Sequence, residues 1–363
     1  MKDPVLLIPR ELGTSLRTGP SGLAAGPCEG AASGAPELAR AGALRHGDRV
    51  VDEERDGVRL TSLDSPLGDG LEVTKRELVD HLDAFADRLV PQLAGRPLTV
   101  KRVRPGAEPF IQRDVPKGAP AWVRTVPTWS DRARREVHQV LVEDRRTLLW
   151  LANQRAVEYH VPFSRVGDEQ PTGLVLDLDP PDGAPFEVVV RAAHLARQAL
   201  ADSGLAAAVK TSGSTGLHVV VPVRGSSPED VAAATRALAV RTERLDPELA
   251  TTAYVLAERG MRVFVDSTRS GRGTLAVAYS PRVRPGLPVS TPVAWDRLDD
   301  VRPGEVTVAT AAGRIPGDPW AAALPEPQAL PADLVAEGHT IPVARVQAMH
   351  EGRRRARAAR QGE

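Results

Sequence analysis

The chain has 363 residues, 42% of them hydrophobic, and its 47 basic and 47 acidic residues cancel to a formal net charge of zero. This composition predicts a globular protein of one large domain or two modest ones. A single cysteine, Cys28, excludes a disulfide framework and a cysteine-rich zinc site, and it fits a reducing cytoplasm. No apolar run is long enough to span a membrane. The charge balance does not exclude nucleic-acid binding, because the distribution of charge matters more than its sum.

The two ends of the chain differ in composition from the middle. Residues 11–45 are rich in Gly, Ala, Pro and Ser and lack aromatic residues, so we expect residues 1–47 to be a flexible leader. Its apolar stretch is short and is broken by Pro9, which argues against a signal peptide. Residues 326–363 are expected to form a tail with a basic, arginine-rich end.

The first folded elements are expected just after residue 48. An Asp56-Gly57 turn between short apolar runs predicts a β-hairpin. Thr74, with Glu77 three residues later, forms a capping box and predicts that a helix starts there and runs over 74–93. The apolar stripe of this helix consists of Leu78, Leu82, Phe85 and Leu89, and Pro91 is expected to end or kink it.

Three strands are expected next, over 97–103, 109–115 and 121–129. The stretch from Arg96 to Arg124 carries seven positive charges against two negative ones. Two interpretations are open for it: a solvated charged face, or a surface that binds the phosphate backbone of a nucleic acid.

In the second half of the chain, strands and helices alternate. Residues 207–211 and 217–223 are two strands joined by a tight Gly-Ser turn, which predicts an antiparallel hairpin and therefore a mixed α/β sheet instead of a doubly wound one. The other expected elements are helices at 147–160, 186–204 and 228–245 and strands at 174–180, 261–266 and 274–280.

Three aspartates follow apolar strands. Asp177 and Asp179 are two residues apart at the end of one strand, so their carboxylates point to the same face, and Asp266 ends another strand. Hard oxygen ligands on one face suit Mg²⁺ or Mn²⁺, and three carboxylates can hold the two metals of a phosphoryl-transfer site. The alternative is a polar strand end where Asp179-Pro180 starts a turn.

The turn between the two hairpin strands is the second candidate site. Residues 210–218 (KTSGSTGLH) place Ser212, Thr215 and two glycines in a turn whose backbone N–H groups can bind an anion, and His218 lies within reach of the same anion. The turn is not a P-loop, because neither the G-K-[ST] ending nor a following helix is present. An ordinary β-turn beside a core histidine remains the alternative.

Two further features are weaker when taken alone. Arg282 and Arg284 follow a strand two residues apart, so both can face a polyphosphate. His160 is a single histidine, for which packing in the core or at the surface is the simpler interpretation.

The motifs together resemble a known family. DLDP, KTSGSTGLHVVVP, RVFVD and AYSPRVRPGLPVSTPVAW occur here in the order found in the polymerase domain of the bacterial non-homologous end-joining ligase D, a member of the archaeo-eukaryotic primase superfamily. The resemblance covers about residues 50–325. It implies an α/β fold of the α+β kind, with primase-type mixed and antiparallel sheets, flanking helices and an RRM-like catalytic core. The domain would span 48–325, with an N-terminal DNA-binding part (48–165) and a catalytic core (166–325).

The resemblance also implies roles for individual residues. Asp177, Asp179 and Asp266 match the three catalytic carboxylates that bind metal, and Mn²⁺ or Mg²⁺ is the implied cofactor. With the turn and the arginine pair included, the predicted nucleotide-binding set is His160, Ser212, Thr215, His218, Arg282 and Arg284. Lys75 matches a lysine that grips the 5′ phosphate of DNA downstream of a gap, and the predicted DNA-binding set is Lys75, Arg59, Lys101, Arg102 and Arg113.

Two positions depart from the family pattern. Thr215 stands where the family usually has Lys, which removes a charge-assisted contact worth about 1.5–3 kcal/mol. Ser270 stands where the family often has Asn. No K-x-D-G motif occurs, so DNA-ligase chemistry by adenylation of that lysine is not expected.

We therefore predict a stand-alone, metal-dependent nucleotidyl transferase of primase type, acting in bacterial end joining in the cytoplasm at the nucleoid. It would extend primer ends with ribonucleotides or deoxyribonucleotides. The expected partners are DNA ends, gapped or primed duplexes, nucleoside triphosphates, Ku and a separate ATP-dependent DNA ligase, with no membrane partner. Two alternatives stay open: a non-catalytic DNA-end-binding scaffold for that ligase and Ku, and a DNA 3′-end phosphoesterase.

Overall fold

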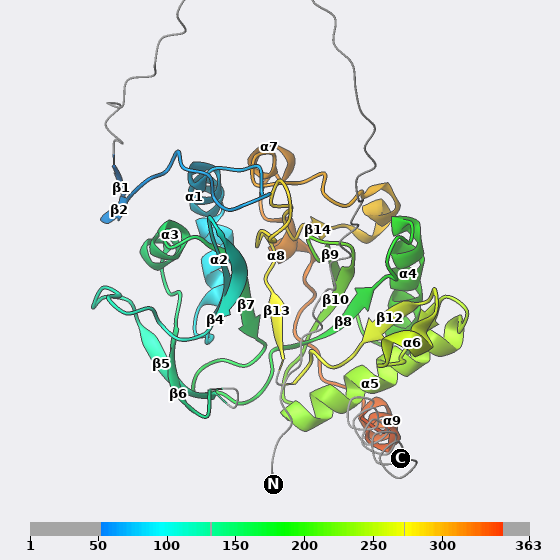
Figure 1. The fold of residues 1–363 in the computed structure, drawn as a ribbon. Coiled ribbons are helices and arrows are strands. Elements are labelled where there is room, and N and C mark those ends of the chain that lie inside the picture. Colours follow the sequence, from blue (N-terminus) through cyan, green and yellow to red (C-terminus); the bar gives the residue numbers. More distant parts are fainter. Residues whose placement is uncertain (1–51, 131–132, 272, 344–363) are drawn as a thin grey trace, which may run out of the picture.

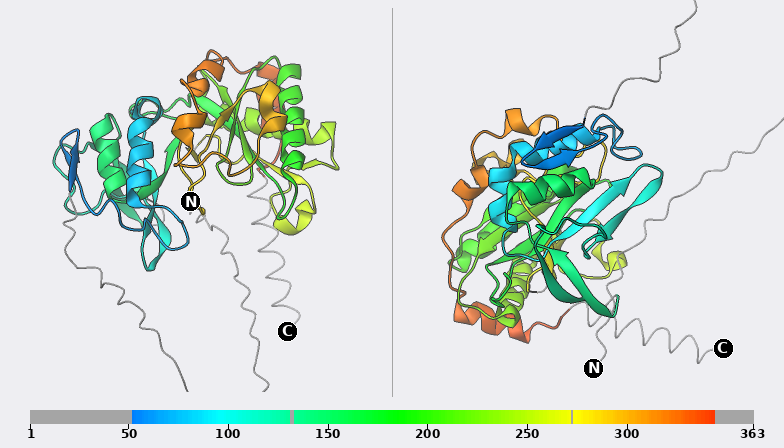
Figure 2. Two further views of the ribbon diagram at one scale, coloured as in Figure 1. Left: turned by 90° about the horizontal axis from the view of Figure 1, so that it is seen from above. Right: turned by 90° about the vertical axis from the view of Figure 1, so that its left-hand side faces the viewer.

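The computed structural model describes residues 52–130, 133–271 and 273–343. The predicted leader (1–47) and the basic end of the predicted tail lie outside the described residues. The described part has two hydrophobic cores. Seen from above, the part built on a four-stranded sheet and the part built on a six-stranded sheet lie side by side (Figure 2).

The six-stranded sheet has the strand order β11-β12-β8-β10-β9-β14. All neighbours are antiparallel except β11 and β12, which are parallel, so the predicted hairpin and the mixed sheet are confirmed. The strands are β8 (Gly173–Asp179), β9 (Ala208–Thr211), β10 (Leu217–Pro222), β11 (Ala250–Thr251), β12 (Val263–Asp266) and β14 (Pro292–Val293).

The two faces of this sheet have different neighbours. Leu174, Leu176 and Leu178 of β8 join the second core, where α4 (Phe186–Asp202) and α5 (Pro228–Leu245) cover the sheet (Figure 1). Because side chains alternate along a strand, Val175 and Asp177 point the other way. Val175 joins the first core, so the predicted carboxylates lie on the face that looks toward the four-stranded sheet.

Residues beyond the expected domain end at 325 continue the fold. Gln328 forms a bridge with Val223, and α9 (Ala332–Thr340) packs on α5. Glu337 of α9 accepts hydrogen bonds from both Arg241 and Arg244. The beginning of the predicted tail is therefore part of the second core.

The four-stranded sheet has the order β13-β7-β3-β4 and packs with three helices around the first core. Its strands are antiparallel throughout. They are β3 (Thr99–Arg104), β4 (Ala107–Gln112), β7 (Ala156–Pro162) and β13 (Thr274–Ala276), and the helices are α1 (Lys75–Ala84), α2 (Ala86–Leu93) and α3 (Arg145–Asn153).

The predicted helix over 74–93 is two helices. The capping box is confirmed, since the Thr74 side chain accepts from Glu77 N and the Glu77 carboxylate accepts from Thr74 N. The interruption falls at Phe85, which leaves helical geometry between α1 and α2, and not at Pro91, which lies inside α2. Phe85 stacks on His81 and packs near Tyr279, so the side chain at the break is held in the core.

The predicted helix over 147–160 is wrong in its second half. Helix α3 ends at Asn153, Arg155 adopts a positive φ of 60°, and Ala156–Pro162 form strand β7. This strand pairs with both β3 and β13, and these long-range pairings outweigh the local helical pattern. The change matters for the site, because β7 places Glu158 and His160 on one face.

Smaller elements complete the structure. The hairpin at Asp56-Gly57 is confirmed, and a second one, whose last strand the sequence did not predict, projects from the first part. These hairpins and the remaining short helices are β1 (Glu53–Arg55), β2 (Val58–Leu60), β5 (Thr125–Ser130), β6 (Arg135–Val140), α6 (Leu256–Arg259), α7 (Ala311–Arg314), α8 (Pro319–Ala323) and the 3₁₀ helix η1 (Trp295–Asp300). No helix among the described residues has the length and apolar character needed to cross a membrane.

Candidate active site

Strand register brings the three aspartates together. Asp177 of β8 is the direct partner of Asp266 on the antiparallel neighbour β12, and Asp179 lies two residues further along β8. One ligand atom from each of the three carboxylates lies within 4.8 Å of the other two. Asp177 and Asp266 are buried, and Asp179 is half-buried. The three residues form a group that could hold a metal ion.

The electrostatics of this group favour a bound cation. Repulsion from Asp177, with burial, raises the pKa of Asp179, and burial with the same repulsion raises the pKa of Asp266. Burial alone would also raise the pKa of Asp177, but His218 and nearby arginines lower it. Three carboxylates in one buried space cannot all stay ionised without positive charge between them. A divalent cation would supply that charge, and an all-oxygen donor set suits Mg²⁺ or Mn²⁺.

Arg269 already supplies one positive charge at this place. Its Nε lies 3.5 Å from an oxygen of Asp177 and 3.5 Å from an oxygen of Asp266. The side chain is about half exposed, so it can move away from the carboxylates without opening the core. No sequence motif had marked this arginine as a site residue.

A polar chain approaches the carboxylates from the neighbouring strands. His218 is the register partner of Asp177, and its Nε2 lies 3.3 Å from the Asp177 carboxylate. On the other side, Lys210 Nζ lies 2.6 Å from His218 Nδ1 and also donates to Ala276 O and Ser290 Oγ. Burial and the neighbouring Lys210 lower the pKa of His218 to about 4. His218, predicted to contact nucleotide phosphates, thus contacts a candidate metal ligand in this structure.

The turn between β9 and β10 is closed around Ser212. Its Oγ accepts from Ser214 N and Gly216 N, each at 3.1 Å. Gly213 has a φ of +74°, and a Cβ there would lie 2.6 Å from Cγ of Arg282. A Cβ on Gly216 would overlap the Leu178 carbonyl oxygen of β8. The glycines therefore let the turn lie directly against the strand that carries the aspartates.

Thr215 and Arg284 differ from their neighbours in exposure. Thr215 is exposed at the tip of the turn, and Arg284 is exposed in the loop that follows β13. Arg282, by contrast, is half-buried and donates from Nη1 to Ser212 O at 2.6 Å. The two predicted arginines thus do not face the same way, and Arg282 is the one joined to the turn.

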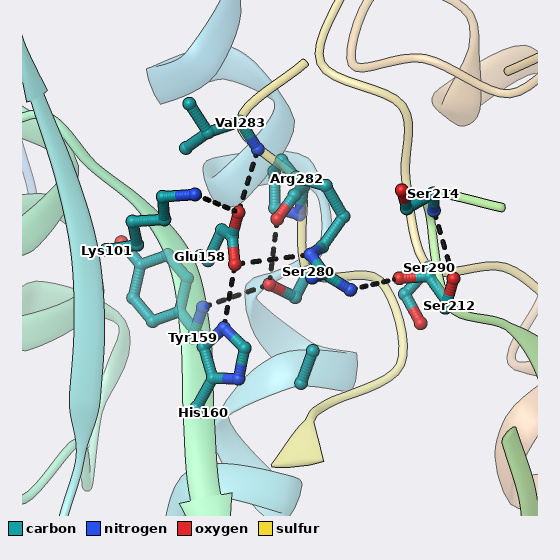
Figure 3. A network of polar contacts seen from close by, with 12 residues as sticks. Lys101, Glu158, Tyr159, His160, Ser212, Ser214, Ser280, Arg282, Val283 and Ser290 are labelled. Atoms are coloured by element: carbon teal, nitrogen blue, oxygen red, sulfur yellow. Dashed lines mark hydrogen bonds and ion pairs between the residues drawn. The ribbon is translucent and has the colours of Figure 1, made fainter. Parts of the chain in front are cut away.

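Glu158 links Arg282 to His160 (Figure 3). Its Oε2 lies 2.8 Å from His160 Nε2 and 3.2 Å from Arg282 Nε, and its Oε1 accepts from Val283 N. Oε1 also lies 3.7 Å from Lys101 Nζ, because Lys101 and Glu158 are register partners on β3 and β7. Glu158 was not among the predicted site residues, although it lies two residues before His160. The signal was the E-x-H spacing, which places both side chains on one face once the segment is a strand.

The predicted DNA-binding residues of β3 and β4 do not share one surface. Lys101 points toward the site, whereas Arg102 is buried and donates to Gln154 O and Gln112 Oε1. Arg113 is exposed just after β4. Arg102 therefore has its donors engaged inside the fold, while Lys101 and Arg113 keep access to a ligand.

Lys75 and Arg59 lie near the N-terminal hairpin. Lys75 is buried at the start of α1 and donates to Thr61 O, and burial together with Arg155 lowers its pKa to about 8. Arg59 is mostly exposed and forms an ion pair with Asp52. Engagement of a DNA phosphate by Lys75 would need a local opening, because the side chain is only 3% exposed.

Comparisons with known proteins agree with one another. Residues 74–320 match the model of the LigD primase-polymerase domain. The chain is 30% identical over 264 residues to the bifunctional non-homologous end joining protein LigD of Bacillus subtilis, covering 71% of this chain and 42% of that protein. It is 32% identical over 255 residues to the multifunctional LigD protein of Mycolicibacterium smegmatis, covering 68% of this chain and 33% of that protein. The chain thus spans less than half the length of these curated relatives.

A solved structure shares the fold. The polymerase domain from Mycobacterium tuberculosis ligase D in complex with DNA matches with a TM-score of 0.66 and 31% sequence identity, covering 74% of this chain and 96% of that chain. The mixed and antiparallel sheets with flanking helices therefore confirm the predicted fold class.

Proposed function

The chain belongs to the LigD primase-polymerase domain family, and we propose on that basis that it is a metal-dependent nucleotidyl transferase that extends primer ends in double-strand-break repair by non-homologous end joining. The observation that carries the proposal is the convergence of Asp177, Asp179 and Asp266 within 4.8 Å, next to a glycine-rich turn and a half-buried arginine. Its substrates would be nucleoside triphosphates, ribo or deoxyribo, and a primed or gapped DNA end.

The carboxylates would hold two divalent cations, Mn²⁺ or Mg²⁺. Such cations activate the primer 3′ oxygen and neutralise the leaving pyrophosphate. The fit rests on the all-oxygen donor set, in which one atom from each of the three carboxylates lies within 4.8 Å of the other two. Mutual repulsion and burial, which raise the pKa values of Asp179 and Asp266, favour a cation between them.

The phosphates of the incoming nucleotide would lie between the turn and the β7 strand. Ser212, Thr215 and the turn's N–H groups would approach from one side, and His160 and Arg282 from the other. His218 would orient Asp177 and stay close to the phosphates, and Arg284 would reach in from the exposed loop. Oriented donors of this kind stabilise the charge that develops in an in-line displacement.

The DNA would be held through phosphate contacts. Lys101 and Arg113 offer positive charge on the first part of the fold, with Arg59 and Lys75 near the N-terminal hairpin and Arg102 supporting the sheet from inside. Binding should weaken steeply with salt, because phosphate contacts release counterions. Ku and a separate ATP-dependent ligase are the proposed protein partners, and the bacterial cytoplasm at the nucleoid is the proposed location.

The test is primer extension. Purified protein with Mn²⁺, ribonucleotides and a primed DNA duplex should lengthen the primer, and Asp177→Ala should not. The carboxylate-to-amide variant Glu337→Gln, in α9 outside the site, is the matched control and should keep activity. No extension by the unchanged chain, with tight binding of gapped DNA, would support a non-catalytic end-binding scaffold instead. The exposed Thr215, in place of a lysine, is the feature that favours this second candidate.

A further inference from the structure

Glu158 is a buried carboxylate on which three basic side chains converge (Figure 3). They come from three different segments: Lys101 from β3, His160 from β7 itself, and Arg282 from the loop after β13. The backbone N–H of Val283 fixes the carboxylate from a fourth direction. Glu158 is only 4% exposed, so these contacts form where water does not compete.

The carboxylate is ionised in this setting. Burial alone would raise the pKa of Glu158, but the hydrogen bond with His160 and the charge of Arg282 hold it well below its usual range. A buried charge with this many partners stabilises a defined geometry of those partners, because any displacement leaves it unpaired. The orientation of His160 and Arg282 therefore depends on Glu158.

The same contacts select which donors face the site. With Nε2 of His160 engaged by Glu158, Nδ1 is the ring nitrogen that remains, and it donates to a phosphate only when the imidazole carries a proton on both nitrogens. Arg282 Nη1 donates to Ser212 O, and its Nε lies 3.2 Å from Glu158 Oε2 in an ion pair without hydrogen-bond geometry, so these two contacts hold the guanidinium beside the glycine-rich turn. A planar guanidinium binds phosphate oxygens well only when its plane is oriented.

We propose that Glu158 is a positioning residue for the nucleotide, which orients His160 and Arg282 toward the triphosphate. The inference rests on the proposed polymerase function and deepens it. Glu158 does not touch the nucleotide itself. Its effect is transmitted through the imidazole of His160 and the guanidinium of Arg282, and Lys101 extends the network toward the strands proposed to hold DNA.

A positioning role of Glu158 and a simple charge effect predict opposite changes in triphosphate binding when Glu158 is replaced. Glu158 is negative, so its removal makes the site more positive and, by charge alone, should strengthen the binding of a triphosphate. If the carboxylate positions His160 and Arg282, its removal releases both side chains and the binding of a triphosphate weakens. Glu158→Gln separates the two, because glutamine has nearly the same shape and no charge.

The experiment measures nucleotide binding and turnover separately. Binding is measured with Mn²⁺ and an ATP analogue whose α–β bridging oxygen is a methylene, which cannot be incorporated. Turnover is measured by primer extension. In Glu158→Gln we expect the dissociation constant of the analogue and the KM for ATP to rise about tenfold or more, the loss of one charge-assisted contact. The KM for primed DNA should change less.

Three variants complete the design. Glu337→Gln removes a carboxylate paired with two arginines outside the site and should leave both constants unchanged. Glu158→Asp keeps the charge but shortens the side chain. A positioning role therefore predicts weaker nucleotide binding, whereas a role of charge alone predicts unchanged nucleotide binding. In a chain that already carries Arg282→Lys, adding Glu158→Gln should weaken nucleotide binding much less than it does in the unchanged chain, because the two substitutions act through one contact.

Each outcome of these measurements supports or overturns the positioning role of Glu158. Equal or tighter analogue binding by Glu158→Gln overturns the positioning role, as does unchanged binding by Glu158→Asp. If Glu158→Gln unfolds, as judged by its thermal transition, Glu158→Asp alone carries the test. If the unchanged chain binds the analogue but extends no primer, the polymerase function fails while the analogue still reports on Glu158. If it does not bind the analogue at all, both fail.

Discussion

The Nζ of Lys210 lies 2.6 Å from Nδ1 of His218, and both residues are buried. This contact fixes the imidazole, because an Nδ1 that accepts from lysine leaves the proton on Nε2, which faces Asp177 at 3.3 Å. Lys210 is the register partner of His218, and His218 is that of Asp177, so the row runs straight across three strands. Hydrogen-bond partners behind a metal-binding residue hold its orientation and tune its affinity.

We predict that Lys210→Met lowers metal affinity and primer extension by about tenfold to a hundredfold, the range for loss of such a supporting contact. Mn²⁺ binding, followed by the rise in melting temperature with Mn²⁺, measures the first effect. Ser290→Ala is the control, since it removes another partner of Lys210 and leaves the contact with His218 in place. Equal losses in the two variants would show that Lys210 acts only on stability.

Thr215→Lys should strengthen nucleotide binding. The side chain of Thr215 is exposed at the tip of the turn, so a lysine fits without displacing packed atoms. A new charge-assisted contact with a triphosphate is worth about 1.5–3 kcal/mol, which corresponds to a KM for ATP lower by about tenfold or more. Thr215→Gln has similar length and no charge. The gain should be absent from the glutamine variant and should shrink with added salt; the same KM in both variants would count against a phosphate contact.

The sequence predicts those parts of the site in which the local residue pattern determines the direction in which the side chains point. Asp177 and Asp179 follow an apolar strand with a spacing of two, so their shared face follows from the strand period. The pairing of Asp266 with Asp177 joins two strands that are far apart in the sequence, so residue spacing could not predict it. The family resemblance predicted that the three aspartates act together. The glycine-rich turn was also predicted, because glycines between two apolar strands mark a turn and tolerate the positive φ that a turn can require.

The missed residues depend on contacts between distant segments. Glu158 was hidden by an unbroken helical pattern, because no Gly or Pro marks the point where Arg155 turns the chain into β7. A lysine in a strand is usually exposed, and the burial of Lys210 requires acceptors from Ala276 and Ser290. Phe85, where the predicted helix breaks, also packs against a residue from a distant segment, Tyr279.

Gly216→Ala should disable the site by moving the turn. A methyl group at this position would overlap the carbonyl oxygen of Leu178, the residue between Asp177 and Asp179 on β8. Either the turn or the strand must shift, at a cost of about 1–3 kcal/mol of folding free energy. We expect primer extension to fall at least tenfold and the melting temperature to drop. Gly313→Ala, in α7 with open space around the new methyl group, should leave both unchanged or raise stability slightly. Full activity of Gly216→Ala would contradict the close contact between turn and strand.

His81 should make the protein sensitive to mild acid. Its ring is buried against Phe85, its Nε2 donates to Tyr279 O, and burial lowers its pKa to about 4 from an ordinary value of 6.5. A histidine with a lowered pKa in the folded state contributes stability that is present above the unfolded pKa, and this stability is lost as the pH falls from about 6.5 toward 4. Between pH 7.5 and pH 5 the loss is about 2 kcal/mol, since each pKa unit corresponds to about 1.4 kcal/mol.

The substitution His81→Gln tests this linkage, because glutamine can still donate to Tyr279 O but does not titrate. We expect it to lower the free energy of unfolding at pH 7.5, where the packed imidazole is lost, and to reduce the fall between pH 7.5 and pH 5. Urea unfolding at the two pH values measures both quantities. His138→Gln, at an exposed position on β6, is the matched control and should leave the pH dependence as it is. An equally steep fall in His81→Gln would assign the acid sensitivity to other groups, of which the buried His218, with a pKa also lowered to about 4, is the first to examine.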